Sequence, residues 1–158
     1  MSSRYSKTSI IFKRGDDFKL DFTVQDTNND VSIAYLATLA TAKELLIEAQ
    51  KADPLVQQDV DDATAAVALA QAQYDASVIV DITNWSMLSQ VRRFTKKIAD
   101  MVIVIIDAPT GRFSVTCPAA QTQLWPVQKL ECDVEFTRPA GKVSSDTFTI
   151  DVQRDITQ

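Results

Sequence analysis

The chain has 158 residues, of which 46% are hydrophobic and 23% charged, and its formal net charge is −5. This composition is typical of one globular domain and excludes a disordered or fibrous protein. No apolar run approaches the roughly 18 residues that cross a bilayer, no apolar signal segment follows Met1, and the acidic charge gives nucleic acid no overall attraction. We therefore expect a soluble protein, made in the cytoplasm, that binds neither membrane nor nucleic acid.

Two β signals separated by a turn come first in the chain. Residues 18–24 alternate apolar and polar side chains, from Phe18 to Val24, which is typical of a strand with one buried face. Residues 9–14 carry the preceding signal, and Gly15 marks the turn between the two. The Asn- and Asp-rich turn at 26–30 would normally lead directly into another strand.

Instead, the composition changes from Val31 to Ala76. This stretch has no Gly and a single Pro, and helix-forming residues dominate it. Apolar side chains recur at alternating spacings of four and three, which predicts two helices, over about 32–52 and 55–76, each with one apolar seam. The seam residues are Tyr35, Leu39, Ala42, Leu46 and Ala49 in the first helix and Val56, Val60, Ala63, Val67, Ala70 and Tyr74 in the second.

The two predicted helices form an antiparallel hairpin. Asp53 and Pro54 make a short reversal between them, because the residue before a proline avoids the α region and proline suits the first turn of a helix. Without residues 31–77 the chain reads as strand, polar turn, strand, and surface turns tolerate insertions. We therefore predict a β domain of residues 1–30 and 78–158 with an inserted arm of residues 31–77. The Ala-rich seam buries little apolar area, so a partner is expected to cover the arm.

The β signals return after Ser77. Turns are predicted at Asp107–Gly111 and Arg138–Lys142, and residues 118–125 form a loop or a single helical turn. Seven or eight short strands in all argue for a mainly β fold, an antiparallel β-sandwich. The strands predicted in this part of the chain cover residues 78–85, 89–92, 101–106, 112–116, 129–137 and 146–153.

The sequence offers little for catalysis. It contains no His, which removes the commonest general base and metal ligand, so we expect no catalytic residues, no metal site and no cofactor. Cys117 and Cys132 form either a disulfide or two reduced, partly buried thiols, and a cytoplasmic origin favours the thiols. Asp59, Asp61 and Asp62 lack the pattern of a calcium loop, and the start of the second helix explains them better.

Three further features have a structural and a functional interpretation. Trp85 follows alternating strand residues and is expected to pack between the sheets. Trp125 either caps one end of the sandwich or lies at a subunit contact, and the two alternatives are equally favoured. A solvated face of a strand and turn explains the one basic cluster better than a phosphate site does. That cluster consists of Arg92, Arg93, Lys96 and Lys97.

Several short motifs, taken in order, resemble those of a known family. They are similar to the small immunoglobulin-like domain of bacteriophage tail and baseplate proteins, including the N-terminal domain of baseplate upper proteins. Family members usually have only a few residues where this chain has the arm. The motifs are Ile11-Phe12-Lys13-Arg14-Gly15-Asp16-Asp17-Phe18, Val80-Asp81-Ile82-Thr83-Asn84-Trp85, Gln90-Val91-Arg92, Asp107-Ala108-Pro109-Thr110-Gly111-Arg112-Phe113 and Asp151-Val152-Gln153-Arg154-Asp155-Ile156-Thr157.

The resemblance implies an immunoglobulin-like β-sandwich in a non-enzymatic virion protein. Such a module assembles in the tail or baseplate through contacts with other phage structural proteins, and we expect a homo-oligomer such as a trimer or hexamer. The alternative is a module whose sandwich loops bind a carbohydrate or protein of the host surface. In the arm, Leu45 and Ile47 lie off the seam and are the better candidates for direct contact with a partner. The full set of predicted partner-binding residues is Tyr35, Leu36, Leu39, Leu45, Leu46, Ile47, Val56, Val60 and Val67.

Overall fold

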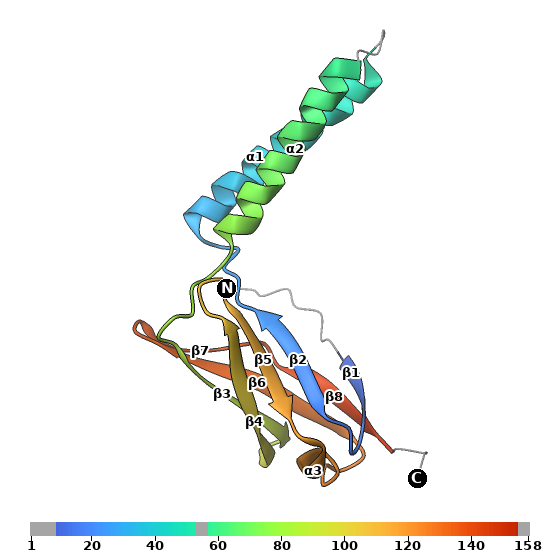
Figure 1. The fold of residues 1–158 in the computed structure, drawn as a ribbon, viewed down its shortest axis with the longest axis vertical. Helices are drawn as coiled ribbons and strands as arrows, with labels where there is room; N and C mark the ends of the chain where they lie inside the picture. The colour runs from blue at the N-terminus through green and yellow to red at the C-terminus, as the bar shows by residue number, and fades with distance from the viewer. Residues whose placement is uncertain (1–8, 53–56, 155–158) are drawn as a thin grey trace. The chain divides into compact units, whose positions relative to one another are not determined.

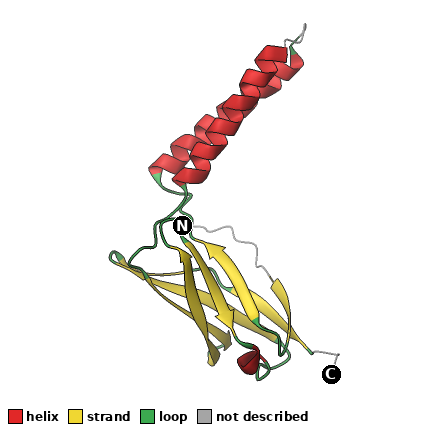
Figure 2. Ribbon diagram, viewed as in Figure 1, coloured by secondary structure: helices red, strands yellow, loops and turns green. Residues whose placement is uncertain are grey.

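The computed structural model describes residues 9–52 and 57–154. The chain divides into two compact units, a β unit formed by the residues up to Thr23 and from Ile82 onward, and a helical unit from Val24 to Asp81. Strand residues outnumber helical residues in the described part of the chain (Figure 2). The predicted mainly β class, with two long helices, is therefore confirmed.

The β unit is built on one eight-stranded sheet. Its order is β1-β8-β6-β3-β4-β5-β2, with β7 paired to β6 (Figure 1). Neighbouring strands are antiparallel except for β1 and β8, which are parallel. The elements are β1 Ser9–Lys13, β2 Phe18–Thr23, β3 Ser86–Arg93, β4 Lys96–Asp107, β5 Arg112–Cys117, the short helix α3 Ala119–Thr122, β6 Lys129–Arg138, β7 Gly141–Ser144 and β8 Phe148–Gln153.

The long strand β4 joins two halves of this sheet. Its first half pairs with β3 as far as Met101, and its second half pairs with β5 from Val102 onward. Because one strand of 12 residues serves both halves, the sheet is continuous and barrel-like. The apolar run that predicted a strand over 101–106 covers only the second half of β4.

The core of the β unit follows the alternation of its strands. Leu130, Cys132 and Val134 of β6 are buried, as the pattern over 129–137 predicts. The ring of Phe113 on β5 stacks on Phe22 with 5.4 Å between centroids and meets Phe136 edge-on at 5.8 Å. Side chains from β2, β5 and β6 therefore share one interior.

The predicted strand over residues 78–85 is wrong. This segment forms a single isolated bridge, between Ile79 and Gln25, and β3 begins only at Ser86. Asn84 has a φ of +66°, and the amide N–H of Trp85 donates to the carbonyl oxygen of Ile82 at 3.0 Å. A left-handed residue inside a tight turn ends the extended backbone, and Asn is one of the few residue types that adopts this conformation readily.

The helical unit is a hairpin of α1, Asp30–Lys51, and α2, Gln57–Ser77, which lie side by side and run in opposite directions (Figure 1). Each end of the two helices lies within two residues of its predicted position. The side-chain oxygen of Asn29 accepts from the N–H of Ser32 at 2.7 Å and caps α1. The side-chain nitrogen of Asn29 donates to the carbonyl oxygen of Ser77 at 3.2 Å, so the two ends of the hairpin meet. The predicted reversal at 53–54 lies outside the described residues.

Candidate interaction surfaces

The two helices of the hairpin meet along a narrow seam. Leu39, Ala42 and Ala70 are buried there, and Val67 packs against them. These are positions that the four-and-three spacing assigns to the seam. Three of the remaining seam positions, Tyr35, Leu46 and Val60, are only half-buried. Because Ala side chains remove little apolar area from water, the seam stabilises the hairpin weakly.

Apolar side chains lie on the outside of the hairpin as well. Ile33, Leu36 and Ile47 are each about half exposed, and their spacing in a helix of 3.6 residues per turn puts them on one line with Ala40. We call these four residues the α1 stripe. Leu45 is similarly exposed on another side of α1. An exposed apolar line beside a weak seam is a surface suited to a partner.

The structure separates the predicted partner-binding residues into two groups. Leu36, Leu45 and Ile47 present apolar surface, whereas Leu39 is 4% exposed and belongs to the seam rather than to a partner surface. Val56 lies outside the described residues. Sequence reasoning missed the exposed side chains of Val31, Ile33 and Leu69. Ile33 could have been found from its position three residues before Leu36, which puts the two side chains on one side of the helix. A search for one apolar seam does not detect a second apolar line of this kind.

Charge is absent from one half of the hairpin. Residues 31–42 of α1 and 63–74 of α2 contain no Asp, Glu, Lys or Arg. The antiparallel arrangement brings these two stretches together, because Asn29 before α1 meets Ser77 at the end of α2. A helix that faces water on its outer side normally carries charge there. The central part of a protein–protein interface is depleted of charged residues, and this half of the hairpin shares that property.

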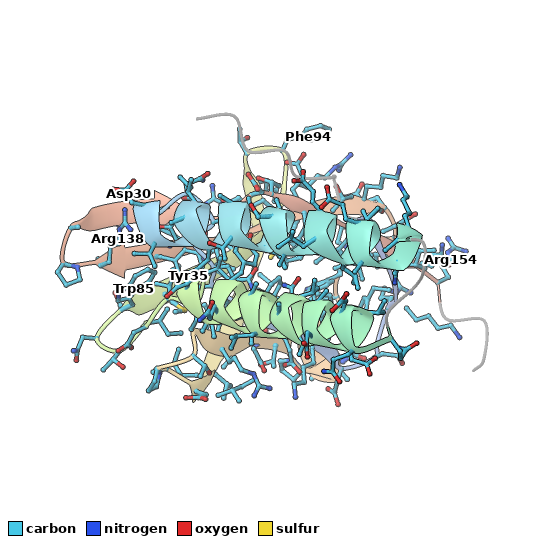
Figure 3. The ribbon with its side chains drawn as sticks, turned by 90° about the horizontal axis from the view of Figure 1, so that it is seen from above. Asp30, Tyr35, Trp85, Phe94, Arg138 and Arg154 are labelled. Carbon is cyan, nitrogen blue, oxygen red and sulfur yellow. The ribbon has the colours of Figure 1, made fainter. Side chains whose placement is uncertain are left out.

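The predicted basic cluster lies at the tip of the β3–β4 hairpin. Arg92 lies opposite Lys97 and Arg93 opposite Lys96. Phe94, in the turn, is 80% exposed and projects outward (Figure 3). The guanidinium of Arg93 lies over the Phe94 ring, 5.8 Å from its centroid. The tip therefore combines four cations with an exposed aromatic ring.

Two of these cations have partners within the β unit. The ammonium of Lys97 lies 2.8 Å from the carboxylate of Asp100, and hydrogen bonds from Lys97 and Gln90 lower the pKa of that carboxyl group. The guanidinium of Arg92 donates to the side-chain oxygen of Gln90 at 2.6 Å. Arg93 forms no ion pair with a described residue. The guanidinium of Arg93 can therefore pair with an acidic group of another molecule.

The two cysteines are free and both are buried. The structure has two unbonded thiols, and it buries them fully, whereas the prediction had them partly buried. Burial raises the pKa of the Cys132 thiol to about 11, and it also raises the pKa of Cys117. The Cys132 sulfur lies 3.3 Å from the hydroxyl oxygen of Ser89. Since the thiolate is the nucleophile and the metal ligand, both thiols are poorly suited to either role at neutral pH.

The raised pKa of Cys132 predicts a loss of stability at high pH. Between about pH 9 and about pH 11 the unfolded thiol ionises while the folded one keeps its proton. The folded state then binds more protons, so the free energy of unfolding falls as the pH rises, by at most about 1.4 kcal/mol per pH unit. Urea unfolding of the wild type and of Cys132→Val across this range measures the effect. The variant should show the shallower slope, and parallel curves would contradict the assignment.

The two tryptophans occupy different environments. Trp85 is half-buried, with Phe136 edge-on at 6.0 Å and the guanidinium of Arg138 5.9 Å from its ring centroid (Figure 3). Trp85 was expected to pack between the sheets, and in the structure it packs on Phe136 while remaining partly exposed. Trp125 is 1% exposed and packs between Phe12 and Phe18, at 5.6 and 5.8 Å. It belongs to the core, and its side chain presents no surface for a subunit contact.

Other kinds of site find no support in the described part of the chain. Residues 9–52 and 57–154 contain no group of three or more His, Cys, Asp or Glu able to hold a metal ion. No helix among them is both long and apolar enough to span a membrane. Comparison with models of known protein families gives no match, and comparison with curated proteins gives no significant match.

Proposed function

We propose that this chain is a non-enzymatic structural module of a bacteriophage tail or baseplate, and that its helical hairpin docks on a neighbouring protein of the virion. The observation that carries the proposal is the uncharged half of the hairpin, residues 31–42 and 63–74, with the exposed apolar side chains of the α1 stripe. A helical hairpin with a weak seam and apolar outer surface gains stability when a partner covers it.

The strand order supports an immunoglobulin-like assignment for the β unit. In such folds, strands C, F and G share a sheet that C′ extends in variable-type domains, and A, B, E and D form the other sheet. The order β8-β6-β3-β4 corresponds to G-F-C-C′, and β4-β5-β2 corresponds to D-E-B. In this proposal the long β4 serves as both C′ and D, which makes one continuous sheet out of two.

The position of the hairpin fits the same proposal. It lies between β2 and β3, which correspond to strands B and C. The loop between these strands is at one end of an immunoglobulin-like domain, where loops present binding surfaces. An insertion at this place leaves the pairing of β2 with β5 and of β3 with β6 intact.

The proposal is tested by the mass of the purified full-length chain under native conditions. A discrete oligomer, such as a trimer or hexamer, is expected, because virion rings are symmetric. In the variant Leu36→Glu, Ile47→Glu the oligomer should dissociate, since both changes place charge in the α1 stripe. Circular dichroism should show unchanged helix content, because both positions are already exposed to water.

A matched control carries the change Glu48→Gln. Glu48 is exposed on the same helix and lies about 100° around it from Ile47 of the α1 stripe, so the oligomer should persist. A wild-type chain that stays monomeric and binds host cells or a glycan array would contradict the proposal and favour a host-surface binding module.

A further inference from the structure

Two locally unfavourable features coincide at the tip of the β3–β4 hairpin. Phe94 has a φ of +52°, a left-handed conformation that strains a bulky side chain and that glycine adopts freely. Four basic residues are paired in the strand register, Arg92 with Lys97 and Arg93 with Lys96, although Lys97 also forms an ion pair with Asp100. Like charges in opposite positions destabilise a strand pair. Backbone strain and local conflicts of this kind cluster at functional sites.

A pocket of about 260 Å³ lies beside the Phe94 ring. Two cations, Arg93 and Lys129, line the pocket together with one acid, Glu131. The excess of positive charge in this lining suits a carboxylate group. The lining residues are Arg93, Phe94, Gln128, Lys129, Glu131 and Thr149.

The start of α2 carries the complementary chemistry. Asp59, Asp61 and Asp62 lie within its first two turns, and α2 contains no Lys or Arg. The side-chain amides of Gln57 and Gln58 donate to one oxygen each of Asp61 and Asp62, at 2.8 and 2.7 Å. These bonds fix the direction of two exposed carboxylates. The chain therefore carries both an acidic helix start and a basic, aromatic strand turn.

We propose that the acidic start of α2 in one copy docks on the tip of the β3–β4 hairpin in a second copy, with a carboxylate entering the pocket beside Phe94. The inference rests on the proposed function and names the neighbour that the helical hairpin meets as another copy of this chain. The two surfaces differ, so the contact is heterologous and repeats from copy to copy as a ring or an open chain. A nucleic acid is disfavoured as the occupant because it would meet a chain of net charge −5.

A charge exchange tests this contact with the full-length chain. The first variant, Arg93→Glu, Lys96→Glu, makes the strand turn acidic and keeps a like-charge pair in the same position. The second variant, Asp61→Lys, Asp62→Lys, makes the helix start basic. Each variant alone places like charges at the contact and should be monomeric in sedimentation. An equimolar mixture should associate again, because each surface then meets its opposite charge.

A control variant, Asp75→Lys, makes a charge change of the same sign at the other end of α2 and should associate like the wild type. Phe94→Gly removes the ring and relieves the strained φ, so its melting temperature should rise while its self-association weakens roughly tenfold. Association of the wild type should also weaken when the salt concentration is raised from about 50 to about 500 mM.

Three results would overturn the proposal. They are a wild-type chain that is monomeric at every salt concentration, charge variants that associate as the wild type does, and a mixture that fails to associate although both variants are folded. The second of these leaves the proposed function in place if the Leu36→Glu, Ile47→Glu variant still dissociates. Failure of both sets of variants removes the assembly role itself.

Discussion

Replacing residues 31–77 by a Gly-Asn bridge is expected to leave a folded β unit that no longer assembles. The two ends of the hairpin meet at the bond between Asn29 and Ser77, so a short bridge spans the gap. The hairpin forms a compact unit of its own, and the strands of the β unit pair with one another. Far-ultraviolet circular dichroism should lose the helical signal, while thermal unfolding of the β unit remains cooperative.

Incorporation into particles is the second measurement on the deletion, and it should fall to background. A full-length chain with Ile33→Glu, Leu36→Glu and Ile47→Glu keeps the hairpin but removes its apolar surface. It therefore distinguishes the effect of that surface from the effect of losing the hairpin. If the apolar surface is responsible, this chain keeps its helices and fails to assemble in the same way. Normal assembly of the deletion would assign the hairpin another role.

Replacement of Trp125 by Ala is expected to lower the free energy of unfolding by about 3–5 kcal/mol. The side chain is 1% exposed and contacts the rings of Phe12 and Phe18, so its removal leaves a cavity that the rigid strands around it fill only in part. Chemical denaturation measures the loss, and an unchanged dependence on denaturant shows that the cooperativity is preserved.

Two further variants complete the test at this position. Leu124→Ala changes the neighbouring residue, which is 80% exposed, and should alter stability by less than about 0.5 kcal/mol. Trp125→Phe keeps ring contacts and removes an indole N–H that has no hydrogen-bond partner among the described residues, so it should cost much less than the Ala variant. Equal losses in the Ala and Phe variants would show that packing does not dominate here.

Patterns with a short period predicted most of the local structure. The alternation of Leu130, Cys132 and Val134 gave β6, and the four-and-three spacing gave both long helices to within two residues. Such patterns reflect burial of one face, which each segment encodes by itself. Sequence reasoning failed where a single residue decides. Asn84, with its positive φ, forms a turn within the strand that was predicted over 78–85.

The turn between β3 and β4 shows a second reason for failure. Phe94 and Thr95 connect the strands, and neither is a usual turn residue, so nothing in the sequence marked the start of β4 at Lys96. The pairing of β1 with β8 joins distant parts of the chain, and periodicity within a segment carries no information about it. The pocket beside Phe94 is likewise assembled from β3, β6 and β8, and its residues could not be grouped from spacing alone.

The bond that joins Asn29 to Ser77 also has a consequence for the order of folding. Contacts between α1 and α2 are local in sequence, and helical hairpins form faster than sheets whose strands are far apart. Once the hairpin has formed, the path from β2 to β3 is shortened to the few residues on either side of it. The entropy lost on closing the loop between β2 and its partner β5 is then smaller than the number of intervening residues suggests. Early formation of the helical hairpin therefore shortens the loop that must be closed when the strands of the sheet pair.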